Sequence, residues 1–130
     1  MAHNRIATLA QLHTAILTST DPTPGLADLA GRLTTDHALR PTLYRLADGH
    51  ELGGAVLWAR IADQLTGAPR LESLTIAAVL AAHGDDPGMA AGLIVAAETT
   101  AATDRITIPP LLALLALDHR IRDHLGHPAA

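Results

Sequence analysis

The spacing of apolar residues along the chain is that of amphipathic helices. Apolar residues recur three and four positions apart, which places them on one face of a 3.6-residue helix. This spacing predicts helices near residues 5–18, 24–33, 40–47 and 51–65, with Asn4 in place to cap the first. No stretch alternates apolar and polar residues with a period of two, so the pattern predicts no strand.

Two later segments are apolar on almost every side instead of along one stripe. Residues 71–83, LESLTIAAVLAAH, have this character, which is typical of a helix at the centre of a bundle. Residues 108–117 are similar, so the first half of a final helix that runs to Gly126 is predicted to be buried, whereas its second half is charged. The fold predicted is all-α, a compact bundle of six or seven helices. We expect a single domain over residues 1–126 and a disordered tail over residues 127–130.

The sequence Gly84-Asp85-Asp86-Pro87 separates the central helix from an Ala-rich helix. A carboxylate at Asp85 or Asp86 can accept hydrogen bonds from the free N–H groups of the next helix, and Pro87 suits its first position. If Gly84 is left-handed, Gly84→Val should cost about 1–2 kcal/mol. So tight a connection predicts an antiparallel helical hairpin. Such hairpins loosely resemble those of tetratricopeptide arrays, although their repeat of about 34 residues is not visible.

Composition excludes several kinds of site and partner. The chain has no Cys and no Lys, which excludes disulfides, thiolate ligands and a phosphate-binding loop that needs Lys. A formal net charge of −4 disfavours nonspecific nucleic-acid binding, because neutralising phosphates requires a cationic face. The apolar runs are shorter than the roughly 20 residues that span a membrane, and the N-terminal pattern lacks the unbroken apolar core of a secretory signal. We therefore expect a cytoplasmic protein that binds neither membranes nor nucleic acid.

Two groups of His and acidic residues are candidates for a metal site. The first group lies at the corner between two helices: His83, Asp85 and Asp86. The second recurs every four residues on the final helix and so shares one face: His119, Asp123 and His127. Both groups also have simpler interpretations, as a helix cap and as exposed ion pairs near a helix C-terminus. The sequence leaves these alternatives open.

Other residues that carry chemistry are sparse. Ser19 and Ser73 are the two serines, and neither lies in the Gly-flanked elbow of a hydrolase. Trp58 suits a position in the core or beside a groove between helices. The sequence therefore indicates binding more than catalysis, and it implies no cofactor.

The order of these landmarks resembles the helical C-terminal region of an actinobacterial family known as domain of unknown function 4192. In that region a Trp-containing helix precedes an apolar helix, a Gly-Asp-Gly corner and an Ala-rich helix that closes in an Asp. The likeness covers about residues 36–115, and Asp86 stands where the family has the second Gly of the corner. It implies a helical fold and an actinobacterial source, and it assigns no catalytic residue. The corresponding landmarks here are Arg40, Trp58, Gly84-Asp85 and Asp104.

The apolar content favours a protein that buries surface against a partner. Hydrophobic residues make up 48% of a chain of 130 residues, and helices that are apolar all round exceed what one core of this size can hide. We therefore expect a non-catalytic helical interaction module, either a homodimer or one that binds another protein. The alternative is a small-ligand or metal-binding helical domain, with or without hydrolytic activity, that uses the corner or the final helix.

Overall fold

The protein is helical throughout the part of the chain that the structure describes. The computed structural model describes residues 2–126, with side chains from 5 to 125, and the tail predicted for 127–130 lies outside them. No strand occurs within residues 2–126, which confirms the all-α bundle. The elements are α1 (Ala2–Thr18), α2 (Pro24–Leu33), the 3₁₀ turn η1 (His37–Leu39), α3 (Arg40–Arg45), α4 (Glu51–Asp63), α5 (Gly67–His83), α6 (Pro87–Asp104) and α7 (Pro110–Gly126).

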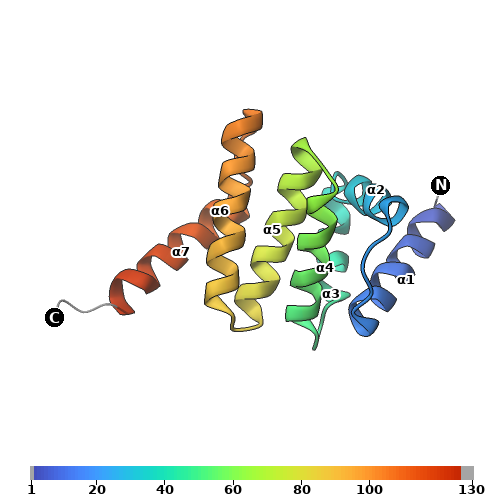
Figure 1. Ribbon diagram of the computed structural model, residues 1–130, viewed down its shortest axis with the longest axis horizontal. Helices are drawn as coiled ribbons and strands as arrows, with labels where there is room; N and C mark the ends of the chain where they lie inside the picture. Colours follow the sequence, from blue (N-terminus) through green and yellow to red (C-terminus); the bar gives the residue numbers. More distant parts are fainter. Residues whose placement is uncertain (1, 127–130) are drawn as a thin grey trace.

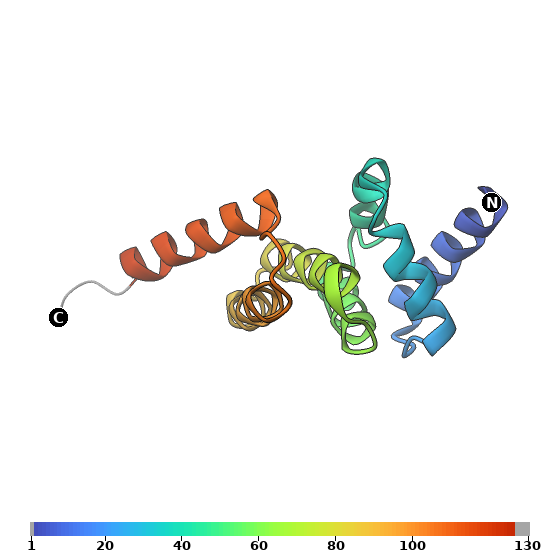
Figure 2. The same cartoon turned by 90° about the horizontal axis from the view of Figure 1, so that it is seen from above.

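Three antiparallel helices, α4, α5 and α6, form the middle of the molecule (Figure 1). α5 packs extensively against both neighbours, and short connections on either side of it turn the chain back beside itself. α1, α2 and α3 lie on the α4 side, whereas α7 lies at the opposite end, beyond α6 (Figure 2). The predicted helical hairpins are therefore present, and α7 occupies one end of the bundle.

α5 supplies both halves of the hydrophobic core, as its apolar pattern predicts. Residues 73–81 are all buried. Ile76 and Leu80 pack with residues of α1–α4, whereas Leu71 and Leu74 pack with residues of α6 and α7. Burial on two sides explains why this helix has no polar face.

Side-chain caps begin two of the N-terminal elements. The Thr23 hydroxyl oxygen accepts a hydrogen bond from the Leu26 N–H at 3.1 Å and starts α2. The Asp36 carboxylate accepts one from the Ala38 N–H at 3.1 Å and starts η1. Each cap satisfies an N–H group that has no partner inside its helix, so short polar residues fix these starts.

Some helix ends differ from their predicted positions. α1 begins at Ala2, so Asn4 lies inside the helix and does not cap it. α3 ends at Arg45 and α4 ends at Asp63, each slightly before the predicted end. The last turn of a helix has incomplete hydrogen bonding, so apolar spacing alone does not determine where it stops.

Candidate functional site

The acidic corner between α5 and α6 includes a helix cap. The Asp86 carboxylate accepts a hydrogen bond from the Met89 N–H at 3.0 Å and starts α6. Pro87 follows in the first turn, where its missing N–H leaves no helical hydrogen bond unmade. The predicted capping role is therefore confirmed for Asp86 and Pro87, and the Asp86 carboxylate is already engaged.

Gly84 does not have the left-handed conformation considered from the sequence. Its φ is −82°, and the next residue, Asp85, has the left-handed φ of 60°. Gly84 instead lies close to Leu52: a Cβ atom at this position would lie 2.7 Å from Leu52 Cδ2, so a larger residue would displace the partly exposed Leu52 side chain. The penalty expected for Gly84→Val therefore has a steric cause, the approach of the α5 C-terminus to α4.

One pocket is lined by a single residue from each of the two predicted groups of His and acidic residues, Asp85 and His119. It lies between the corner and α7 and has a volume of about 160 Å³. Asp85 lines it from the corner, and Asp118, His119 and Arg122 line it from α7. Asp118 and Arg122 form an ion pair at 3.0 Å. Asp85 and His119 are far apart in the chain, so only the docking of α7 could reveal that they share a pocket.

The predicted ligand sets are not assembled in the described residues. Catalytic zinc uses three protein ligands, yet no group of three or more His, Cys, Asp or Glu residues within the described part of the chain is placed to share an ion. His83 and Asp123 do not line the pocket that contains Asp85 and His119. His127 lies outside the described residues.

A second cluster of ionisable groups joins α3 to α5. Arg40, the first residue of α3, donates a hydrogen bond to the Glu72 carboxylate at 2.6 Å, and both side chains are mostly shielded from solvent. Burial raises the pKa of the neighbouring Tyr44 to about 12; the Arg40 charge lowers this pKa and the Glu72 charge raises it. The Tyr44 phenol therefore stays protonated near neutral pH. The cluster attaches α3 to α5.

Trp58 belongs to the core and does not line a groove. It is fully buried in the cluster that α1–α5 form together with Ala90 of α6. Its indole Nε1 atom has no hydrogen-bond partner among the described residues. Burying a polar group without a partner is unfavourable, so Trp58 stabilises the fold through the volume of its ring.

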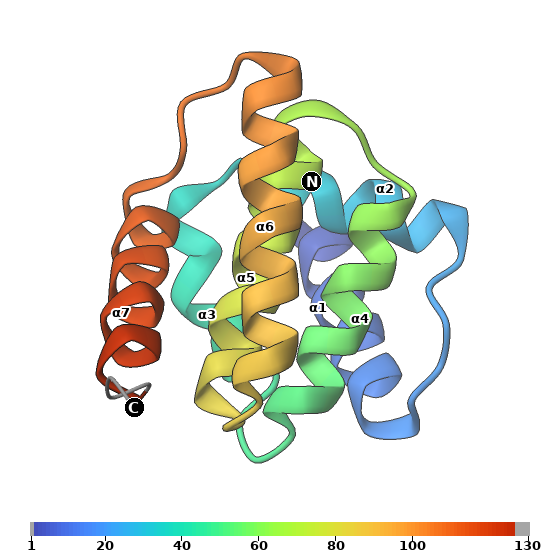
Figure 3. The same cartoon turned by 60° about the vertical axis from the view of Figure 1, so that its left-hand side comes forward.

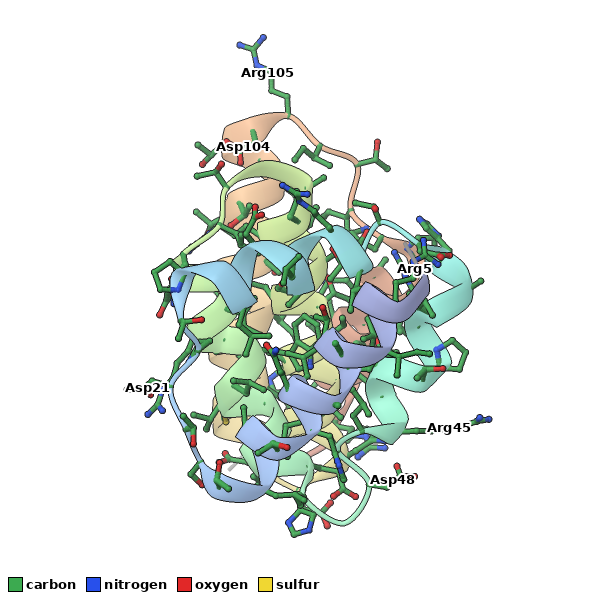
Figure 4. The ribbon with its side chains drawn as sticks, turned by 90° about the vertical axis from the view of Figure 1, so that its right-hand side faces the viewer. Arg5, Asp21, Arg45, Asp48, Asp104 and Arg105 are labelled. Atoms are coloured by element: carbon green, nitrogen blue, oxygen red, sulfur yellow. The ribbon has the colours of Figure 1, made fainter. Side chains whose placement is uncertain are left out.

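The remaining landmark, Asp104, lies at the far end of α6. It is the last residue of that helix, and Arg105 follows with a left-handed φ of 54°. Arg105 points away from the protein (Figure 4). This helix end lies away from the corner pocket, at the opposite end of α6, so Asp104 contributes nothing to that pocket.

α7 exposes an apolar face that the sequence pattern assigned to the core. Its inner face is buried at Leu112 and Ala116, where the helix turns back beside α6 (Figure 3). Its outer face has no neighbouring element within the described residues, so the predicted burial of the whole first half is wrong. We call this outer face the α7 stripe. Its members are Leu114 (64% exposed), Leu117 (54%), Ile121 (48%) and Leu125 (74%).

Charged residues lie along both edges of the α7 stripe. Asp118 and Arg122, which form the ion pair already described, lie one turn apart along one edge. Arg120 lies along the other edge and donates a hydrogen bond to the Glu98 carboxylate of α6 at 2.9 Å. This interhelical ion pair attaches α7 to the bundle while its outer face remains exposed.

Two other hollows have local structural explanations. One of about 360 Å³ between α1 and α2 is lined mainly by Ala and Thr residues, and Asp21 at its edge pairs with Arg60 of α4. Another of about 650 Å³ lies between α4 and α6. There Arg70 donates to the Ala62 carbonyl oxygen at 2.9 Å and to the Thr100 hydroxyl oxygen at 3.2 Å. Arg70 thereby satisfies a carbonyl group near the end of α4.

Comparisons with known proteins add no assignment. No family model, curated protein or solved structure matches the chain. The resemblance to domain of unknown function 4192 and the likeness to tetratricopeptide arrays therefore stay predictions. Among residues 2–126, no helix is both long enough and apolar enough to cross a membrane.

Proposed function

We propose that this chain is a non-catalytic helical module that binds protein through the α7 stripe. The observation that carries the proposal is the exposure of four large apolar residues along one line of a single helix. Isolated apolar residues are common on protein surfaces, whereas a contiguous apolar patch marks an interaction site. The α7 stripe is therefore the surface that we expect a partner to cover.

The attachment of α7 supports this role. Its inner face packs against α5 and α6, so the helix is held in place while its outer face stays accessible. The four residues of the α7 stripe follow one another at intervals of three, four and four positions. This is the spacing with which one helix presents an apolar line to another helix.

The pocket beside α7 favours binding over nucleophilic catalysis. It contains an Asp–Arg ion pair, a second Asp and a His, and no Ser, Thr or Tyr residue lines it within the described residues. Covalent acyl or phosphoryl transfer commonly uses such a hydroxyl or thiol beside a base. The carboxylate and imidazole groups fit a supporting role beside the proposed interface.

Site-specific photo-crosslinking in the source cells tests this proposal. A photoreactive phenylalanine analogue at position 117, in the middle of the α7 stripe, should form a light-dependent adduct with a protein. The matched control is the same analogue at position 6, because Ile6 is 68% exposed but lies on α1 at the other end of the molecule. Equal labelling from both positions, or no adduct from position 117, would contradict the proposal.

A further inference from the structure

We propose that the occupant of the α7 stripe is a second copy of this chain, whose α7 packs antiparallel to the first across a two-fold axis. This inference rests on the proposed function and names its partner. A two-fold interface uses the same patch on both subunits, so the patch must be complementary to itself. Both the apolar residues and the charges of α7 meet this requirement.

The apolar residues match in an antiparallel arrangement. A two-fold axis that crosses the helix pair between positions 119 and 120 places Leu114 of one copy opposite Leu125 of the other. The same axis places Leu117 near Ile121 of the second copy. Leu114 and Leu125 then face each other directly, and Leu117 and Ile121 lie within one position of each other across the axis, so each large side chain of the α7 stripe meets another large apolar side chain.

The charges along one edge match in the same register. In an antiparallel two-fold pair, equal edges of the two helices face each other. The edge that carries Asp118 and Arg122 therefore meets its own copy in the opposite direction, which places Asp118 of each chain near Arg122 of the other. A parallel pair would instead place this edge beside the other edge of the second copy, which carries Arg120 and His124. Arg122 would then lie close to the positive charge of Arg120 in the second copy. Charge complementarity thus selects the antiparallel arrangement.

The other edge is already compensated within each chain. Arg120 would approach Arg120 of the second copy near the two-fold axis, but each is paired with Glu98 of its own α6 at 2.9 Å. The Glu98 carboxylate therefore reduces the repulsion between the two guanidinium groups.

The second half of α7 gains the most from such pairing. Residues 121–125 are all exposed, so little of the bundle supports this half of the helix. Helical segments this short are marginal in water unless an apolar face is packed. A single helix face is smaller than the roughly 800 Å² that each partner contributes to a standard interface. The expected dimer is therefore one that dissociates on dilution.

Two charge-reversed variants test the partner and the register together. Asp118→Arg makes the edge wholly positive and Arg122→Asp makes it wholly negative, so each variant alone should dimerise with a dissociation constant raised by about tenfold or more. An equimolar mixture should recover the affinity of the unmodified chain, because the positive edge of one variant then meets the negative edge of the other. Sedimentation velocity over a concentration series measures all three constants.

α2 provides a matched control pair. Asp28 and Arg32 form an exposed ion pair with the same four-residue spacing, at 3.1 Å, so Asp28→Arg and Arg32→Asp should leave the dissociation constant unchanged. If the α7 variants dimerise as the unmodified chain does, or if their mixture recovers no affinity, the antiparallel pairing is overturned. A monomeric unmodified chain whose position 117 crosslinks to a different protein also overturns it, while the proposed function stands. A monomer that gives no adduct at position 117 overturns both.

Discussion

Trp58→Ala is expected to lower the free energy of unfolding by about 3–5 kcal/mol, a large part of the stability of a domain this size. Trp58 is the largest fully buried side chain, and it packs in the cluster shared by α1–α6. Truncation to Ala would leave a cavity. The surrounding helices cannot move inward to fill it, because each is also held by other contacts. Urea denaturation followed by circular dichroism measures the loss; fluorescence cannot, since Trp58 is the single Trp.

Trp58→Phe is the control for this prediction. It retains much of the ring volume and removes the Nε1 atom, which has no hydrogen-bond partner among the described residues. Because burying that N–H group is unfavourable, the Phe variant should lose less than half of what the Ala variant loses. A loss below about 1 kcal/mol for Trp58→Ala would mean that the ring is not packed as described.

Gly54→Val should lower the free energy of unfolding by about 3 kcal/mol. A Cβ atom at Gly54 would lie 2.6 Å from the Cβ atom of Ala47 and 3.0 Å from Leu80 Cδ1. The Ala47 Cβ atom cannot rotate away, because it is bonded directly to the backbone. Inserting a branched side chain must therefore push α4 away from its neighbours, and the change can be measured by the same urea denaturation.

Gly92→Val is the matched control for Gly54→Val. Gly92 lies inside α6, and a Cβ atom there would meet nothing within 4 Å. Helix propensity slightly favours Val over Gly, so this variant should stay within about 0.5 kcal/mol of the unmodified protein. If both variants lost the same free energy of unfolding, the cause would be a general intolerance of Val in these helices. The close contact between Gly54 and Ala47 would then not explain the result.

Features fixed by neighbouring residues were predictable from the sequence. The capping role at the corner follows from Asp86 and Pro87 alone, because a carboxylate can reach the free N–H groups of the next helix. The central place of α5 follows from its lack of a polar face. Which residue of the corner is left-handed was not predictable, because Asp85 takes this conformation while Gly84 packs close to Leu52, which is distant in the chain.

The location of the exposed apolar face on α7 depends on how the helices pack, and the spacing of apolar residues carries no information about that packing. Residues 108–117 are apolar on nearly every side, and this pattern does not tell a helix surrounded by its own chain from one that is packed on one side. The structure places α7 at an end of the bundle, so Leu112 is buried while Leu114 is exposed. The sequence predicted more apolar surface than one core can hide in both all-apolar segments, but residues 73–81 are buried and the exposed apolar line lies on α7, a division that required the fold.

Native mass spectrometry of the purified protein over a concentration series tests the α7 interface most directly. The chain mass is 13.5 kDa. We expect the unmodified protein to show twice this mass at high concentration and the single-chain mass on dilution. Leu114→Glu should give the single-chain mass throughout, because a carboxylate in the α7 stripe would be buried against apolar residues. Ile6→Glu, a similarly exposed change on α1, should behave as the unmodified protein does. A single-chain mass for the unmodified protein at every concentration, or a dimer that survives Leu114→Glu, would contradict pairing through α7.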